Sequence, residues 1–212
     1  MTCMARADIE HVLNSIDRTT KLGRRDLALL QFLYNTGARA QEVVDLRIPS
    51  VRFEMPAQVK LLGKGRKERL CPLWPESIEL LRLMLKDRRS HPTDDAPLFV
   101  NGAGRPLTRF GLRHIVRVRA ATAANSRPAL SRMTISPHTF RHTTALHLLQ
   151  AGVELNVARS WLGHASIETT HAYVEIDLQM KRNALQACEP PGLRSASPAW
   201  ATPDLLTWLE SL

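Results

Sequence analysis

The chain has 212 residues, of which 44% are hydrophobic, and this length accommodates one sizeable hydrophobic core. Lysine and arginine number 29 against 20 aspartates and glutamates, so the formal net charge is +9 and favours a polyanionic partner. Three widely separated cysteines argue against a disulfide framework and against a CxxC metal site. Because the chain has no apolar run of ~18 residues and no signal peptide at its start, we expect a cytoplasmic protein without membrane contact.

The first elements are helical. Apolar residues at helical spacing predict a short helix from Arg6 to Ile16 and a stronger one around Leu27 to Tyr34. Asn35-Thr36-Gly37 then predicts a helix end, in which Gly37 adopts the left-handed conformation. A further helix is expected over residues 38–46.

An extended segment follows, and it predicts a small antiparallel sheet. Between residues 51 and 73, apolar and polar residues alternate on either side of a glycine-rich basic turn at 63–67. Helices are expected over 75–86 and, after a loop that runs through Gly104, over 108–123. The last of these carries arginines spaced four residues apart on one face: Arg109, Arg113 and Arg117.

The C-terminal third is again helical. Residues 127–134 are expected to form a loop, and Ser136-Pro137 predicts the start of a helix that runs to Gln150. A helix at 156–162 should end at Gly163, and Ser166 should cap a short one that contains Tyr173. Residues 189–202 have the composition of a linker. The last helix, 203–212, has an apolar face but is too short to be stable unless it docks on another surface.

One predicted helix start gathers groups that bind phosphate. PHTFRH places His138 and Arg141 three residues apart, and His138 and His142 four apart, beside the free N–H groups of the helix end. A guanidinium clamps two phosphate oxygens, and an imidazole exchanges a proton near neutral pH. The same residues also fit an ordinary solvated helix end, so this segment alone leaves both interpretations open.

Two more features lie in the same third of the chain, namely LGH at 162–164 and Tyr173 nine residues after His164. The chain has two tyrosines, and Tyr34 lies in the apolar stripe of its helix, which favours a core position. Tyr173 is therefore our candidate nucleophile. A phenol with a pKa of about 10 is ionised to about one part in a thousand at pH 7, so it needs neighbouring cations.

Four segments in this order resemble the tyrosine recombinases, also called the phage integrase family: TGARAQEVVDL at 36–46, LLGKGRKERLCPL at 61–73, HTFRH at 138–142 and LGHASIETTHAY at 162–173. The resemblance covers residues 23–186. It implies the family's catalytic DNA breaking-rejoining fold, an α+β fold that is mainly α-helical with a small antiparallel three-stranded sheet. It also implies site-specific recombination of double-stranded DNA, through a 3′-phosphotyrosyl intermediate and without metal, ATP or another cofactor.

Carried over to the matching positions, the resemblance implies that Arg39, Arg141 and His164 surround the scissile phosphate. Glu42, three residues after the first arginine, matches an acidic residue that supports the site. Because phosphoryl transfer spreads charge over the phosphate oxygens, loss of either arginine should be severe. Out of this context, Arg39 and Glu42 also fit a surface ion pair.

The resemblance further implies that His138 assists proton removal from Tyr173 and that Lys64 protonates the departing 5′-oxygen. The choice of Lys64 over Lys67 depends on the family position alone. We expect His142, His147 and His171 to be structural. Further basic residues are expected to contact DNA phosphates: Arg66, Lys67, Arg69, Arg109, Arg113 and Arg117.

Other functions remain as alternatives. A metal site at His138, His142 and His164 is disfavoured because HTFRH lacks the glutamate of HExxH and places an arginine between its histidines. GKGRK lacks the spacing of a nucleotide-binding loop. Two further alternatives share the remaining features. One is a DNA-binding remnant or accessory protein of a mobile element, without productive recombination. The other is DNA relaxation like that of type IB topoisomerases.

The expected organisation is a short N-terminal segment (1–20), a catalytic domain (21–188), the linker (189–202) and a docking helix (203–212). The separate N-terminal DNA-clamping domain usual in the family is expected to be absent. We expect a homo-oligomer on DNA, in which the last helix is exchanged between protomers, and association with other recombinases of the same element. Localisation is expected to be cytoplasmic, at the nucleoid.

Overall fold

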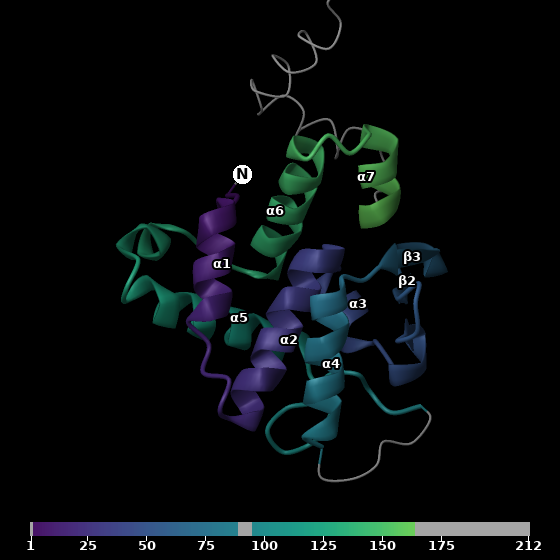
Figure 1. Cartoon of the computed structure of the whole chain (residues 1–212), viewed down its shortest axis with the longest axis horizontal. Helices are drawn as coiled ribbons and strands as arrows, with labels where there is room; N and C mark the ends of the chain where they lie inside the picture. Colours follow the sequence, from purple (N-terminus) through teal and green to yellow (C-terminus); the bar gives the residue numbers. More distant parts are fainter. Residues whose placement is uncertain (1, 89–94, 164–212) are drawn as a thin grey trace, which may run out of the picture. The chain divides into compact units, whose positions relative to one another are not determined.

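Helix α2, Lys21–Thr36, is the element around which the fold is built (Figure 1). It begins where the Thr20 hydroxyl accepts a hydrogen bond from the Gly23 backbone N–H at 3.0 Å. It ends at Gly37, whose φ of 57° confirms the predicted left-handed cap. Helices α1, α4 and α6 pack against it. The structure, a computed structural model, describes residues 2–88 and 95–163, with only the backbone at Lys64, and all of these belong to one compact unit.

The described elements follow the predicted order closely. The other α-helices within these ranges are α1 (Arg6–Asn14), α3 (Ala40–Val44), α4 (Pro75–Lys86), α5 (Arg109–Ala124), α6 (Pro137–Gln150) and α7 (Leu155–Leu162). Short 3-10 helices are η1 (Ile48–Ser50), η2 (Lys64–Arg66) and η3 (Pro128–Arg132). The predicted loop at 127–134 is thus partly helical, because Pro128 fixes a helical φ at the first position of η3.

A small antiparallel sheet has the order β1-β2-β3, with β1 at Val51–Arg52, β2 at Gln58–Leu62 and β3 at Glu68–Pro72. Val59 lies opposite Cys71, and Leu61 lies opposite Arg69. Because side chains alternate across a strand, these four residues share the inward face of the sheet. The described part of the chain therefore has the mainly helical fold with a three-stranded sheet that the sequence predicts.

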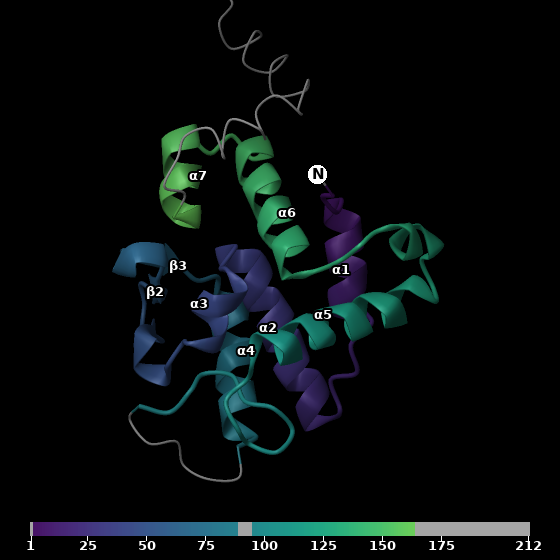
Figure 2. The same ribbon diagram turned by 180° about the vertical axis from the view of Figure 1, so that it is seen from behind.

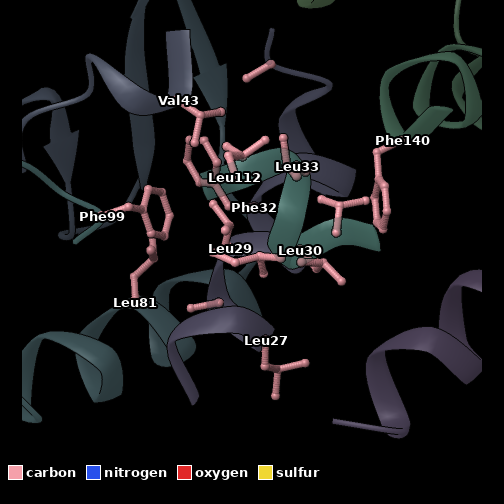
Figure 3. Close-up of a cluster of buried hydrophobic side chains, with 14 of the residues drawn as sticks. Leu27, Leu29, Leu30, Phe32, Leu33, Val43, Leu81, Phe99, Leu112 and Phe140 are labelled. Atoms are coloured by element: carbon pink, nitrogen blue, oxygen red, sulfur yellow. The ribbon is translucent and has the colours of Figure 1, made fainter. Parts of the chain in front are cut away.

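The hydrophobic core is one cluster that reaches from α1 to α6. Figure 3 shows Phe32 beside Phe99 in this cluster, and the two rings meet edge to face with centroids 5.7 Å apart. Ile9 and Val12 of α1 are fully buried in the same cluster, and α1 packs against α2 and α5. The segment expected at residues 1–20 therefore contributes directly to the core that carries the site.

The predictions for the last part of the chain lie outside the described residues. They comprise the short helix with Tyr173, the linker at 189–202 and the docking helix at 203–212. Of the helices that the structure does describe, none is both long and apolar enough to cross a membrane.

Candidate active site

The first predicted site residue, Arg39, is the N-cap of α3. Glu42 lies one turn later, and its Oε2 accepts a hydrogen bond from the Arg39 backbone N–H at 2.8 Å. Its Oε1 accepts one from Arg39 Nη1 at 3.1 Å. The side chain of Arg39 is 39% exposed, whereas that of Glu42 is 3% exposed. This pair is therefore not a surface ion pair, because its carboxylate is inside the protein.

Glu42 has a second arginine partner, Arg69 of β3. Arg69 Nη1 and Nη2 donate to the two carboxylate oxygens of Glu42 at 2.9 and 2.7 Å, and Arg69 Nε donates to the Trp161 carbonyl at 3.0 Å. Burial by itself raises the pKa of Glu42, but the hydrogen bonds and charge of Arg69, with smaller contributions from Arg39, lower the pKa below its usual value. The carboxylate is therefore held ionised between two guanidinium groups.

Arg141, the second predicted arginine, is 3% exposed and lies where two helices end. Its Nη1 donates to the Gly37 carbonyl at 2.6 Å, at the end of α2, and its Nη2 donates to the Leu162 carbonyl at 2.7 Å, at the end of α7. The last carbonyls of a helix lack partners within the helix and carry partial negative charge, so a guanidinium is favoured there.

Arg39 reaches the same helix end, because its Nη2 donates to the Gly163 carbonyl at 3.3 Å. The two arginines thus bond to the carbonyls of successive residues at the C-terminus of α7, directly before His164. They come from positions 102 apart in the chain, and the fold brings them together. Figure 2 shows α7 beside α6, and α7 also packs against β3 of the sheet.

The end of α2 is closed by side chains from α6 and α7. The Thr144 hydroxyl donates to the Tyr34 carbonyl at 2.7 Å, and the Trp161 indole Nε1 donates to the Asn35 carbonyl at 3.1 Å. Gly37 has a φ of 57°, and a Cβ there would lie 2.5 Å from Leu162 Cδ2, so the backbone conformation and the close approach of α7 both favour glycine. Packing at this junction therefore sets the position of the Arg141 guanidinium.

His138 is exposed in the first turn of α6, which Ser136 caps as predicted. Desolvation lowers the pKa of His138, and the positive charges of Arg141 and Arg39 lower it further. The imidazole is therefore kept neutral near pH 7, as a proton acceptor requires. The His142 ring meets it edge to face with centroids 4.1 Å apart, and burial followed by the charges of His138 and Arg141 lowers the pKa of His142 to about 4.

Of the predicted catalytic residues, one has only its backbone described and two lie outside the described residues. Lys64 begins η2, so its backbone lies in the β2–β3 connection. His164 and Tyr173 lie outside the described residues altogether, as does His171. Their proximity to the two arginines remains a prediction.

The expected DNA contacts fall into two groups. Arg66 and Lys67 are exposed in the β2–β3 connection, and the outward face of α5 exposes its three evenly spaced arginines: Arg109, Arg113 and Arg117. Arg119 is different, because it pairs with the buried Asp26 at 2.6 Å. Phe110, which the sequence did not single out, is 82% exposed beside the first arginine of α5.

Arg69 corrects one prediction. It was expected to contact DNA, but its side chain is 9% exposed and each of its three guanidinium nitrogens donates a hydrogen bond inside the protein. The reason is the alternation of β3, since Glu68 and Leu70 face solvent while Arg69 and Cys71 face inward. The sequence contained a signal for this orientation. Residues two apart in a strand share a face, and Arg69 is two residues before the apolar Cys71.

Tyr34 and His147, which the sequence predicts to be structural, contact each other. The Tyr34 hydroxyl and His147 Nδ1 are 2.9 Å apart, and the Tyr34 ring packs on Trp74 with centroids 5.6 Å apart. This arrangement agrees with the structural roles expected for Tyr34 and His147. Within residues 2–88 and 95–163, no three His, Cys, Asp or Glu side chains are grouped to hold a metal ion, and the third ligand of the metal alternative, His164, is beyond that range.

The chain belongs to the phage integrase family, whose model matches residues 3–180. A candidate integrase/recombinase, y4rC, of Sinorhizobium fredii is 36% identical over 99% of this chain and 62% of its own length. Tyrosine recombinase XerD of Chlorobaculum tepidum is 37% identical over 79% of this chain and 54% of its own length. The chain thus spans a little over half of the length of these relatives.

Solved structures agree with this family. The XerH site-specific recombinase, in a post-cleavage complex with its palindromic difH substrate, matches 87% of this chain and 52% of its own with a TM-score of 0.74 and 29% identity. The catalytic domain of bacteriophage HP1 integrase matches 92% of this chain and 99% of its own with a TM-score of 0.56. At 20% identity, the latter supports the fold alone.

Proposed function

We propose that this protein is a site-specific DNA recombinase that cleaves and rejoins strands through a 3′-phosphotyrosyl intermediate. Membership of the phage integrase family supports this function. The observation that carries it is the meeting of Arg39 and Arg141 at the C-terminus of α7, beside His138 and directly before His164. Such a cluster of fixed cations is suited to a phosphate in the dissociative transition state of phosphoryl transfer.

In the proposed reaction, the Tyr173 hydroxyl attacks the phosphorus and the bond to the 5′-oxygen breaks. His138 accepts the phenolic proton, and Lys64 supplies a proton to the departing 5′-oxygen. The products are a 3′-phosphotyrosyl bond and a free 5′-hydroxyl. Because the energy of the phosphodiester bond is kept in the tyrosyl ester, attack by a 5′-hydroxyl rejoins a strand without ATP, and no metal is required.

Double-stranded DNA is the proposed partner, and two basic surfaces are proposed to hold it. One is the β2–β3 connection with Arg66 and Lys67, and the other is the outward face of α5, with its three exposed arginines. Contacts of this kind are mainly to phosphates, so affinity should fall steeply with salt. Assembly of several protomers on DNA, with exchange of the 203–212 helix, belongs to the same proposal.

The test is formation of a covalent adduct with nicked duplex DNA. A pool of end-labelled duplexes, each with a nick just downstream of a randomised cleavage position, is incubated with the protein in the presence of a strong chelator. Loss of the short fragment beyond the nick prevents rejoining, so the label stays on the protein in a denaturing gel. We expect an adduct with the wild-type protein and none with Tyr173→Phe.

Tyr34→Phe is the matched control, because it removes the same hydroxyl from the tyrosine that pairs with His147. It should form the adduct normally. An adduct that depends on Tyr34, or that disappears in chelator, would overturn the proposed chemistry. Relaxation of any supercoiled plasmid without strand exchange between two sites would instead favour a topoisomerase, and binding without an adduct would favour a DNA-binding remnant.

A further inference from the structure

Arg69 is the centre of a buried polar cluster that joins three segments of the chain. Its guanidinium bonds to Glu42 of α3 through two nitrogens and to the Trp161 carbonyl of α7 through the third, while its own backbone belongs to β3. Each of these segments carries or adjoins a residue of the proposed mechanism. Arg39 precedes α3, His164 follows α7, and Lys64 precedes β3 in the same hairpin.

We propose that Arg69 is a positioning residue that sets the relative placement of Arg39, Lys64 and His164. This inference rests on the proposed function, which it deepens by adding a residue without contact to DNA. The contact to Arg39 runs through Glu42. Its Oε1 accepts hydrogen bonds from the guanidinium groups of both arginines, and its Oε2 accepts one from the Arg69 guanidinium and one from the Arg39 backbone N–H. A shift of Arg69 therefore moves the carboxylate that holds Arg39 in place.

Two glycines extend the cluster to the other two residues. Gly163 directly precedes His164, and a Cβ at this position would lie 2.9 Å from Arg69 Nη1 and 3.0 Å from Arg69 Cδ. Gly163 also has a φ of 63°, which disfavours any other residue. Gly63 directly precedes Lys64, and a Cβ there would lie 3.4 Å from Glu42 Oε1. The backbones before both residues thus pack directly on the Arg69–Glu42 pair.

The geometry of this cluster requires an arginine. A lysine keeps the charge, but its single ammonium cannot form the parallel bonds to both Glu42 oxygens while also reaching the Trp161 carbonyl. Such a substitution leaves buried acceptors without partners and allows the segments to shift. A misplacement of about 1 Å at a catalytic group can lower a rate by a factor on the order of 10².

An exposed ion pair on the outward face of the same sheet provides the control. Glu68 faces outward and pairs with Lys60 of β2 at 3.1 Å, with side chains 56% and 55% exposed. Lys60→Ala therefore removes one positive charge from the same sheet and breaks one ion pair, but it does not touch the buried cluster. Exposed pairs of this kind contribute little to stability.

The experiment compares Arg69→Lys and Lys60→Ala with the wild type, using the full chain and the nicked DNA pool. With enzyme in excess and saturating, the cleavage rate constant does not depend on the fraction of misfolded protein, so a merely structural role leaves it unchanged. For Arg69→Lys we expect this rate to fall by a factor on the order of 10–100, while the DNA dissociation constant changes by less than about threefold. Lys60→Ala should cleave at the wild-type rate.

A second measurement follows amide hydrogen exchange without DNA. Arg69→Lys should accelerate exchange of the Gly63 and Gly163 amides, which bond to the Lys67 and Ser160 carbonyls. Unchanged cleavage by Arg69→Lys, or a loss confined to DNA affinity, would overturn the positioning role alone. Absence of an adduct with the wild-type protein would overturn the proposed function, and with it any catalytic meaning of Arg69.

Discussion

The arginines of the junction between α2, α3 and α7 differ from those of α5 in what surrounds them. Arg39, Arg69 and Arg141 are held by carboxylate or carbonyl oxygens of the protein, whereas Arg109, Arg113 and Arg117 have exposed side chains with no ion pair recorded among the described residues. A fixed cation favours a transition state because it needs no reorganisation during the reaction, whereas an exposed cation mainly attracts the DNA backbone. The two regions should therefore respond differently to substitution.

The largest effect is expected from substitution of Lys64 in the β2–β3 connection. Lys64→Ala should lower the cleavage rate by a factor on the order of 10²–10⁴, because the 5′-oxygen then leaves without a proton. Substrates in which sulfur replaces the bridging 5′-oxygen should restore the rate, since a thiolate leaves without protonation. Lys67→Ala should show no such rescue. If sulfur rescues Lys67→Ala and not Lys64→Ala, the assignment of the general acid is wrong.

The second-largest effect is expected from substitution of Arg141, an arginine held in place by backbone carbonyls. Arg141→Lys should lower the cleavage rate at saturating DNA by a factor on the order of 10²–10³, because an ammonium cannot keep the bonds to both the Gly37 and Leu162 carbonyls, and the cation is then no longer preorganised for the phosphate. DNA affinity should change far less. The measurement is single-turnover cleavage beside equilibrium binding, with circular dichroism to confirm folding. A loss in affinity as large as the loss in rate would make Arg141 a binding residue and remove the distinction between the two regions.

A smaller and different effect is expected on α5. Arg113→Ala should weaken DNA binding several-fold and reduce the slope of log K against log salt by about 0.9, the contribution of one phosphate contact. Cleavage at saturating DNA should stay close to that of the wild type. Titrations at four or more salt concentrations give the slope. An unchanged slope would mean that the exposed face of α5 does not face the DNA backbone.

The smallest effect concerns stability in acid. The pKa of His142 is lowered to about 4 by burial and by the charges of His138 and Arg141. Between pH 6.5 and about 4, the unfolded chain therefore binds a proton that the folded chain does not, and stability should fall as pH falls. In His142→Gln, the fall in unfolding free energy between pH 7 and pH 5 should be smaller than in the wild type by on the order of 1 kcal/mol, a figure that allows for the partial exposure of this side chain. Urea unfolding at pH 7 and pH 5 measures it, with His114→Gln of the exposed face of α5 as control.

Local signals in the sequence predicted the element boundaries that depend on neighbouring residues. Ser136 caps α6, and Gly37 and Gly163 end α2 and α7 in the left-handed conformation, as expected. Capping and positive φ are properties of a few consecutive residues, so they need no knowledge of the fold. The 3-10 helix η3 was missed because five residues carry too little periodicity to be distinguished from a loop.

Residue types and motif order determined the family, the candidate arginines and the presence of a small sheet. The tertiary structure decided which oxygens hold each arginine, because the partners of Arg141 are main-chain carbonyls of α2 and α7, and a backbone carbonyl leaves no mark on sequence composition. It also decided that Arg69 points inward, since the partners of that guanidinium lie 27 and 92 positions away in the chain. Only the folded chain brings Glu42 and the Trp161 carbonyl to the inward face of β3. There they become partners for a buried guanidinium, so Arg69 lies on that face and not on the exposed one.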